Sequence, residues 1–310
     1  MQSSHDQRLH GTWATVLLPI APDESIDLGR LREELEVLVS AELAGCYTNG
    51  TAGELHALDE AEHDAVSEIV AQRCGRAGVA FQIGASHMSG QICLSRIRRA
   101  RELAPAAIQV TLPDWLPLGP DEVIAAVSRM AEVADPVPIV LYNPPHAKTI
   151  CDVTTFAALS ETVPGLAGIK VVPDGGAWLD SIRVAAPRLA VFVPGHDLAS
   201  GLERGAAGSY SNIACLSPDG AGRFEATARH SRAEGLDLER RIKQFLAEHI
   251  GPLQAEGYSN TALDKTLATI GDWAPVGTRV RWPYKSVPEE QARTLAPLAR
   301  RRLPELFSSE

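Results

Sequence analysis

The sequence predicts an α/β fold, a closed (β/α)8 TIM barrel followed by a C-terminal helical extension. First, eight short apolar runs alternate with longer stretches of helical periodicity, which indicates parallel strands joined by helical crossovers. Second, eight such units are the number that closes a barrel. Third, the first run continues into LLPIAPDES and lacks the G-x-G-x-x-G turn that usually opens a doubly wound nucleotide-binding sheet.

The eight expected strands are short and separated by segments long enough to hold a crossover helix. They cover residues 12–18, 45–48, 79–84, 107–111, 138–142, 167–172, 190–193 and 208–211. Strands of a parallel barrel are buried on both faces, so short continuous apolar runs are the expected signal.

Helices are expected between these strands because apolar residues recur there at intervals of three and four. The clearest case is the segment 28–39, where leucines stand at positions 28, 31, 35 and 38. The segments 59–73 and 121–133 behave similarly, and each begins with an aspartate, which favours a helix N-terminus.

The strand pattern stops after Ser217. Only helical periodicity remains beyond it, over residues 218–250, 259–270 and 288–306. We therefore expect a barrel domain over residues 1–217 and a C-terminal helical extension over residues 218–310.

Composition restricts the classes of partner. The chain holds 29 Lys and Arg against 39 Asp and Glu, a net charge of −10, which disfavours nucleic acid and anionic membranes as ligands. No apolar stretch approaches the roughly 20 residues of a membrane helix, and the first residues do not resemble a signal peptide. Five dispersed cysteines without a C-x-x-C pair indicate reduced core thiols. We expect a cytoplasmic protein.

Lys170 is the first candidate for chemistry, because it lies inside the apolar run LAGIKVV. The other four lysines lie in polar or loop-like stretches. Burial disfavours an ammonium and lowers its pKa, and a neutral amine attacks carbonyl carbons to form a Schiff base. The structural alternative is a lysine that caps a strand end and pairs with a carboxylate.

Tyr142 is the second candidate. Tyr47, Tyr142 and Tyr210 each fall at the carboxyl end of an expected strand, which in a barrel is the end that carries active sites. Tyr142 precedes Lys170 by one strand–helix unit, so we expect the two side chains to project from neighbouring strands. A phenol beside an amine can relay protons; a tyrosine at the rim of the core is the alternative.

The loop after the second strand, residues 49–54, reads NGTAGE. Its glycines permit a sharp turn close to a ligand, and consecutive backbone N–H groups can hold a carboxylate. Glu54 is placed to cap the following segment. Taken alone, such a loop is common between strand and helix.

Five motifs in fixed order give the chain a family resemblance. It resembles the dihydrodipicolinate synthase / N-acetylneuraminate lyase superfamily of class I aldolases in YTNGTAGELHALDEAEH, LYNPP, GIKVVPDG, VPGHD and GAAGSYS. The tail motifs DKTLATIG and RVRWP follow the same pattern. The resemblance extends from about residue 11 to residue 218 and into the extension.

The resemblance implies a site for pyruvate or another 2-oxo acid. Lys170 corresponds to the Schiff-base lysine and Tyr142 to the catalytic tyrosine. The carboxylate-binding loop corresponds to Thr51 and Ala52. Two further positions follow: Gly195 is the glycine of the seventh loop, and Tyr210 is the residue whose backbone carbonyl faces the keto acid. The implied chemistry requires neither a metal nor an organic cofactor.

The chain departs from the enzymes that make dihydrodipicolinate. Those enzymes carry two adjacent threonines where this chain has Thr51 and Ala52, and a Tyr-Tyr pair after the fourth strand where it has Asp114 and Trp115. A proton relay of that kind is therefore incomplete here. Some hydratase–aldolases of aromatic 2-oxo acids carry a tryptophan at this place, which keeps that substrate class open.

The loop after the fifth strand, PPHAKT, also departs, because it lacks the arginine that usually meets the carboxylate of the aldehyde substrate. Lys148 offers a point charge in its place and not a planar fork. We assign both Lys148 and Trp115 to substrate binding.

The expected function is a Schiff-base lyase, an aldolase or a dehydratase, whose partner is a small 2-oxo acid. Two alternatives stay open: dihydrodipicolinate synthase proper, and a non-catalytic barrel that binds 2-oxo acids. The resemblance also implies a homotetramer, or a dimer. The second substrate or leaving group, and the direction of the reaction, do not follow from the sequence.

Overall fold

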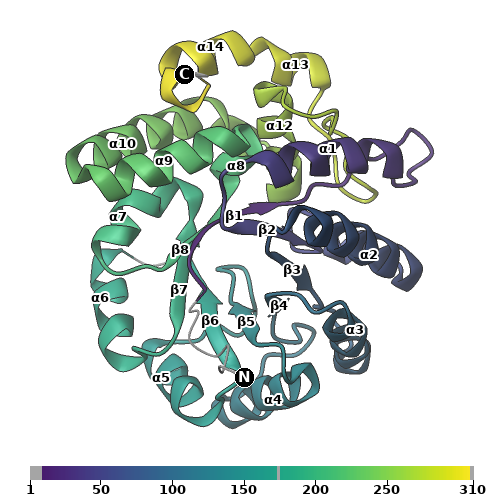
Figure 1. Ribbon diagram of the computed structural model, residues 1–310, viewed down its shortest axis with the longest axis vertical. Helices are drawn as coiled ribbons and strands as arrows, with labels where there is room; N and C mark the ends of the chain where they lie inside the picture. The colour runs from purple at the N-terminus through teal and green to yellow at the C-terminus, as the bar shows by residue number, and fades with distance from the viewer. Residues whose placement is uncertain (1–8, 173–174, 308–310) are drawn as a thin grey trace.

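Eight parallel strands pair in chain order, and the first pairs with the last, so the sheet closes into a barrel (Figure 1). The computed structural model describes residues 9–172 and 175–307. Its strands are β1 (Gly11–Thr15), β2 (Gly45–Thr48), β3 (Phe81–Gly84), β4 (Ala107–Val110), β5 (Ile139–Tyr142), β6 (Leu166–Lys170), β7 (Ala190–Pro194) and β8 (Gly208–Ser211). The predicted TIM barrel is confirmed.

The first strand is shorter than the apolar run that predicted it. β1 ends at Thr15, although Val16, Leu17 and Leu18 are fully buried. The backbone N–H of Leu17 donates to the buried carboxylate of Glu34 at 2.7 Å, so it is not available to a neighbouring strand. The apolar residues after Thr15 therefore indicate burial and not strand pairing. The Glu34 side chain accepts the hydrogen bond that a neighbouring strand would otherwise accept.

The helices of the barrel alternate with the strands as predicted. They are α1 (Leu28–Ser40), α2 (Glu60–Ala77), α3 (Gly90–Glu102), α4 (Pro120–Ala134), α5 (Val153–Thr162), α6 (Gly176–Ala185), α7 (Leu198–Glu203) and α8 (Asn212–Leu216), with short 3₁₀ helices η1 (Leu55–Ala57) and η2 (Gly195–Asp197).

Local capping explains where these helices start and stop. The Asp27 carboxylate accepts from the first turn of α1. Asp59 and Glu62 form a capping box at the start of α2, and Gly78, at φ 69°, ends that helix. The aspartate start predicted at residue 59 is thus its N-cap.

Helices alone follow Ser217 as far as residue 307, the last that the structure describes, as expected. They are α9 (Pro218–His230), α10 (Arg232–His249), α11 (Gly251–Ala255), α12 (Asn260–Gly271), α13 (Glu289–Thr294), α14 (Ala296–Arg302) and η3 (Pro304–Leu306). The helical stretch expected over 218–250 is divided at Ser231, whose extended backbone precedes α10. In Figure 1 these helices gather at one end of the molecule beside α8 and α1.

Two apolar layers hold the barrel. One fills its interior and includes Trp13, Tyr47, Val140, Phe192 and Tyr210. The other lies between the strands and the surrounding helices and continues into the extension. Within residues 9–172 and 175–307 no helix is long and apolar enough to cross a membrane.

Candidate active site

Lys170 is the last residue of β6, and its amine is surrounded by three tyrosine rings. Its Nζ lies 4.2 Å from the centroid of the Tyr142 ring and 5.1 Å from the centroids of Tyr47 and Tyr210. The three tyrosines come from the carboxyl ends of β5, β2 and β8. The convergence that the strand positions predicted is therefore present.

Tyr142 and Lys170 are partners in the register of β5 and β6. In parallel strands, residues directly opposite each other point to the same face, so both side chains project into the barrel mouth. No hydrogen bond from the Tyr142 hydroxyl is found within the described residues, which leaves that group available to a ligand.

A cavity of about 490 Å³ opens beside these residues. Thr51, Ala52, Tyr142, Lys170 and Tyr210 all line it. Its outer wall comes from the C-terminal extension, including residues of α10, α11 and α12. The extension thus completes the cavity, a contribution that the sequence did not predict.

Burial of the Lys170 amine lowers its pKa to about 8, although the nearby Asp264 carboxylate opposes this shift. At pH 7 about a tenth of such amines are neutral, against less than about one in a thousand for an ordinary lysine. This neutral fraction is the nucleophile that carbonyl chemistry needs.

The phenols near Lys170 remain protonated at neutral pH. Burial, with the charge of Asp264 second, raises the pKa of Tyr142 to about 12. Burial also raises the pKa of Tyr47 and of Tyr210, whose hydroxyl donates to Gln82 Oε1 at 2.5 Å. Because the Tyr210 hydroxyl is already engaged, Tyr142 is the better placed proton donor.

The loop after β2 is tightly folded against the site. Asn49 and Glu54 both have φ of 53°, and a Cβ on Gly50 would lie 2.9 Å from the Tyr47 ring. Glycine at position 50 therefore lets the loop approach the tyrosine that faces Lys170. Thr51 and Ala52 follow directly and line the cavity.

Glu54 does not cap the next helix, contrary to expectation. Its side chain makes no capping hydrogen bond to η1 and instead forms a buried ion pair with Lys265 of α12. Lys265 is fully buried, so placing it in a polar, loop-like stretch was also wrong. Its Nζ further donates to the carbonyl of Arg279 at 2.6 Å. The pair joins the loop after β2 to the extension.

Gly195 lies between two residues of the cavity wall, Pro194 and His196. A Cβ at position 195 would come within 2.3 Å of the Ser211 hydroxyl. Glycine is needed there because β7 and β8 end close together.

Trp115 and Lys148 lie at the rim, outside the lining of this cavity. Trp115 is 69% exposed, and Lys148 Nζ donates to its carbonyl at 2.8 Å while lying 5.1 Å from its ring centroid. The backbone N–H of Lys148 donates to Asp114. The loops after β4 and β5 are thus joined to each other.

Asp264 is the residue that sequence reasoning missed. Asn260, Leu263, Asp264 and Leu267 line the cavity, at the spacing of one helical face. The sequence feature that could have identified Asp264 is an acidic residue among apolar residues on one face of the predicted helix.

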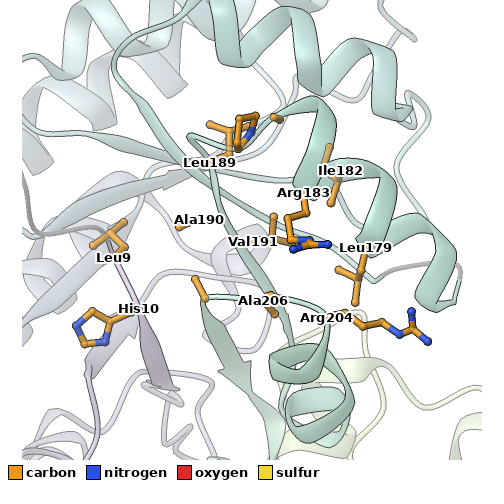
Figure 2. A pocket seen from close by; sticks show the side chains of 14 residues that line it. Leu9, His10, Leu179, Ile182, Arg183, Leu189, Ala190, Val191, Arg204 and Ala206 are labelled. Carbon is orange, nitrogen blue, oxygen red and sulfur yellow. The ribbon is translucent and has the colours of Figure 1, made fainter. Parts of the chain in front are cut away.

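A second cavity, of about 380 Å³, lies at the opposite end of the barrel (Figure 2). It is bounded by Leu9 and His10 before β1, by α6, by the first residues of β7, and by residues that precede β7 and β8. Its charged groups include Arg183 and Arg204, and the latter pairs with Asp180. It offers no lysine or tyrosine, so carbonyl chemistry belongs to the first cavity. No cluster of three or more metal-binding side chains occurs in the described part of the chain.

Comparison with known families gives a match over most of the chain. The model of the dihydrodipicolinate synthetase family matches residues 8–301. An uncharacterised DapA-like lyase of Halobacterium salinarum is 29% identical over 215 residues, 68% of this chain and 69% of the relative. An N-acetylneuraminate lyase of Enterobacter is 26% identical over 65% of this chain and 68% of its own length.

Solved structures share the fold. YagE of Escherichia coli K12, a prophage protein of the dihydrodipicolinic acid synthase family solved with pyruvate, superimposes with a TM-score of 0.83 at 19% identity. The match covers 95% of this chain and 98% of YagE. CdNal of Clostridium difficile, solved with mannosamine, also gives 0.83, at 15% identity over 97% of this chain and all of that one.

Proposed function

The chain belongs to the dihydrodipicolinate synthetase family, and from that premise we propose that it is a Schiff-base lyase acting on pyruvate or another 2-oxo acid through Lys170. The observation that carries the proposal is the lowered pKa of Lys170 inside a ring of three tyrosines at the mouth of the barrel. A partly neutral amine in a cavity at the barrel mouth is equipped to attack a carbonyl carbon.

The first step forms the imine. The Lys170 nitrogen bonds to C2 of the oxo acid, the C=O π pair moves to oxygen, and that oxygen takes a proton from Tyr142. A second proton passes from the nitrogen to that hydroxyl, and its loss as water leaves a protonated imine, which withdraws electrons from C3. Cleavage of a C–C or C–O bond further along the substrate then proceeds through the enamine, as an aldolase or a dehydratase requires.

The substrate carboxylate is assigned to the loop after β2. The Thr51 hydroxyl and the backbone N–H of Ala52 are the donors we propose, because both residues line the cavity beside Lys170. Gly195 has no side chain, so the seventh loop can approach the substrate closely there. The backbone carbonyl of Tyr210 faces the keto acid.

Trp115 and Lys148 are assigned to the distal part of a longer substrate. Trp115 offers a broad apolar face and Lys148 a single positive charge at the outer rim. This combination favours a bulky or partly apolar substrate segment over a small polar aldehyde. Dihydrodipicolinate synthesis is therefore the less favoured reaction, since Ala52, Asp114 and Trp115 lack the hydroxyls of that relay.

We propose that the protein is a cytoplasmic homotetramer or dimer. The exposed apolar side chains Met88, Trp115, Leu116 and Ile150 stand on the loops after β3, β4 and β5. Large exposed apolar side chains on neighbouring loops are typical of an interface. Sedimentation of the purified protein tests this assembly.

A substrate panel tests the function. Purified protein is offered 2-oxo sugar acids, hydroxy-oxo diacids and aromatic 2-oxo acids, and release or consumption of the 2-oxo acid is followed. We expect turnover of at least one class, lost in Lys170→Ala. Binding of pyruvate without turnover of any class would favour the non-catalytic barrel.

A further inference from the structure

Asp264 faces the amine of Lys170 from the C-terminal extension. It occupies the cavity-lining side of α12, one turn after Asn260 and one turn before Leu267. Its charge acts on groups from several elements of the barrel, namely Lys170 on β6, Tyr142 on β5, Tyr47 on β2 and Cys215 on α8. The carboxylate therefore lies centrally among the groups that surround the reacting amine.

The Asp264 carboxylate is not committed to another partner. Within residues 9–172 and 175–307 it makes neither a hydrogen bond nor an ion pair. The other acidic groups nearest the site differ: Glu54 pairs with Lys265, and Asp197 pairs with Lys243. A partly buried carboxylate without a donor is costly, and such a group in a cavity commonly marks a functional position.

Two contacts fix the side of α12 that faces the cavity. Lys265, the next residue, is fully buried and pairs with Glu54, so Asp264 is turned away from that pair and toward the site. The Thr261 hydroxyl donates to the carbonyl of Thr51 at 2.8 Å. The helix is therefore attached directly to the loop that we assign to the substrate carboxylate.

We propose that Asp264 is the general base that removes a proton from C3 of the pyruvate imine on Lys170, and returns it in the reverse direction. In this step the C3–H bond breaks and its electron pair forms the C2=C3 double bond. The C2=N π pair moves to nitrogen as a lone pair, and the proton bonds to the Asp264 carboxylate. The proposal rests on the proposed imine chemistry and adds a group that this chemistry requires.

Asp264 suits this role better than the tyrosine beside Lys170. Burial raises the pKa of Asp264 to about 7, against the opposing charge of Lys170, while the pKa of Tyr142 rises to about 12. A base with a pKa near the working pH accepts and returns a proton most efficiently. Tyr142 is thus matched to donating protons at oxygen, and Asp264 to exchanging them at carbon.

A positive charge at Lys170 favours the ionised form of the Asp264 carboxyl, which is the form that can accept a proton. The positive charge of Lys170 acts on the Asp264 carboxylate directly, and Cys215, His196 and Lys243 line the same cavity. The Lys170 amine that attacks the carbonyl is neutral, whereas the protonated imine that it forms holds a positive charge. That charge favours the ionised carboxylate, so imine formation itself prepares the base.

Exchange of the pyruvate methyl protons with deuterated water tests the proposal without knowledge of the second substrate. The loss of the methyl proton signal is followed by NMR, and imine formation is measured separately by borohydride trapping. Asp264→Asn is expected to lower the exchange rate by on the order of 10²–10⁴, the scale of a lost general base. Trapping is expected to persist, because removal of the Asp264 charge leaves more of the Lys170 amine neutral.

Asp272→Asn is the matched control, since it removes an exposed carboxylate that follows α12 and lies outside this cavity. It should exchange like the unmodified protein. Asp264→Glu keeps the carboxyl group and should exchange faster than Asp264→Asn but more slowly than the unmodified protein. It is the variant to measure if Asp264→Asn does not fold.

Two results would overturn the assignment. Normal exchange in a folded Asp264→Asn variant that still traps pyruvate would show that another group is the base. Loss of trapping together with exchange would show that Asp264 only supports Lys170. Absence of trapping in the unmodified protein is a different result, because it contradicts the imine chemistry itself.

Discussion

Tyr142 and Lys170 stand directly opposite each other on β5 and β6, with the lysine Nζ 4.2 Å from the tyrosine ring centroid. Neither residue lies on a loop whose conformation must first be ordered. The barrel ladder itself sets their separation, so the proton donor and the nucleophile are preorganised by the fold.

Replacing Tyr142 removes the proposed proton donor and leaves the ring in place. Tyr142→Phe is expected to slow turnover by on the order of 10²–10⁴, while trapping of the imine proceeds more slowly but still occurs. Steady-state kinetics with a substrate found in the panel measures the effect. An unchanged rate would make Tyr142 a packing residue at the rim of the core.

The amine of Lys170 should titrate near pH 8, because burial disfavours its charged form. The neutral, reactive fraction therefore rises most steeply between about pH 7 and 9 and levels off above that range. Competitive acylation over a pH series, read by peptide mass spectrometry, gives the pKa of each lysine. Exposed Lys285 is the internal control. Equal titration of the two lysines would contradict the desolvated site.

The buried pair of Glu54 and Lys265 should matter for stability. Lys265→Met leaves the Glu54 carboxylate buried without its cation, and such a change costs about 3–5 kcal/mol. Urea unfolding measures the loss, and Lys285→Met, at an exposed position, should cost at most about 1 kcal/mol. A loss for Lys265→Met no larger than that of the control would mean that the pair does not join the extension to the barrel.

Condensation of pyruvate with aspartate semialdehyde should be slow or absent. Ala52 lacks a hydroxyl, and Trp115 has no titratable proton where the relay of the lysine-biosynthetic enzymes carries tyrosine. A coupled assay for dihydrodipicolinate with purified protein provides the measurement. Turnover at the rates of biosynthetic enzymes would show that another group completes the relay.

The barrel was predictable because its signals are local and repeated. Apolar runs predict strands correctly wherever the buried residues also pair with a neighbouring strand. The predicted end of a strand is wrong by a few residues, as after Thr15, where a side chain accepts the hydrogen bond in place of a neighbouring strand. The meeting of Tyr142 and Lys170 followed from strand order alone, since carboxyl ends of barrel strands share one face.

Residues of the extension were not predictable in the same way. Asp264 and Lys265 are adjacent in sequence, yet one faces the cavity and the other is buried against Glu54. Their roles depend on how α12 packs across the barrel mouth, and this contact joins residues 211 positions apart. Local periodicity carries no information about such a partner.

Borohydride reduction in the presence of pyruvate tests the central claim most directly. The protein is reduced with and without pyruvate, weighed intact and then mapped by peptide mass spectrometry, with Lys170→Ala treated in parallel. We predict one reduced pyruvate adduct per chain, located on Lys170, and none in the folded Lys170→Ala variant. An unmodified Lys170, or normal turnover by Lys170→Ala, would contradict the Schiff-base mechanism.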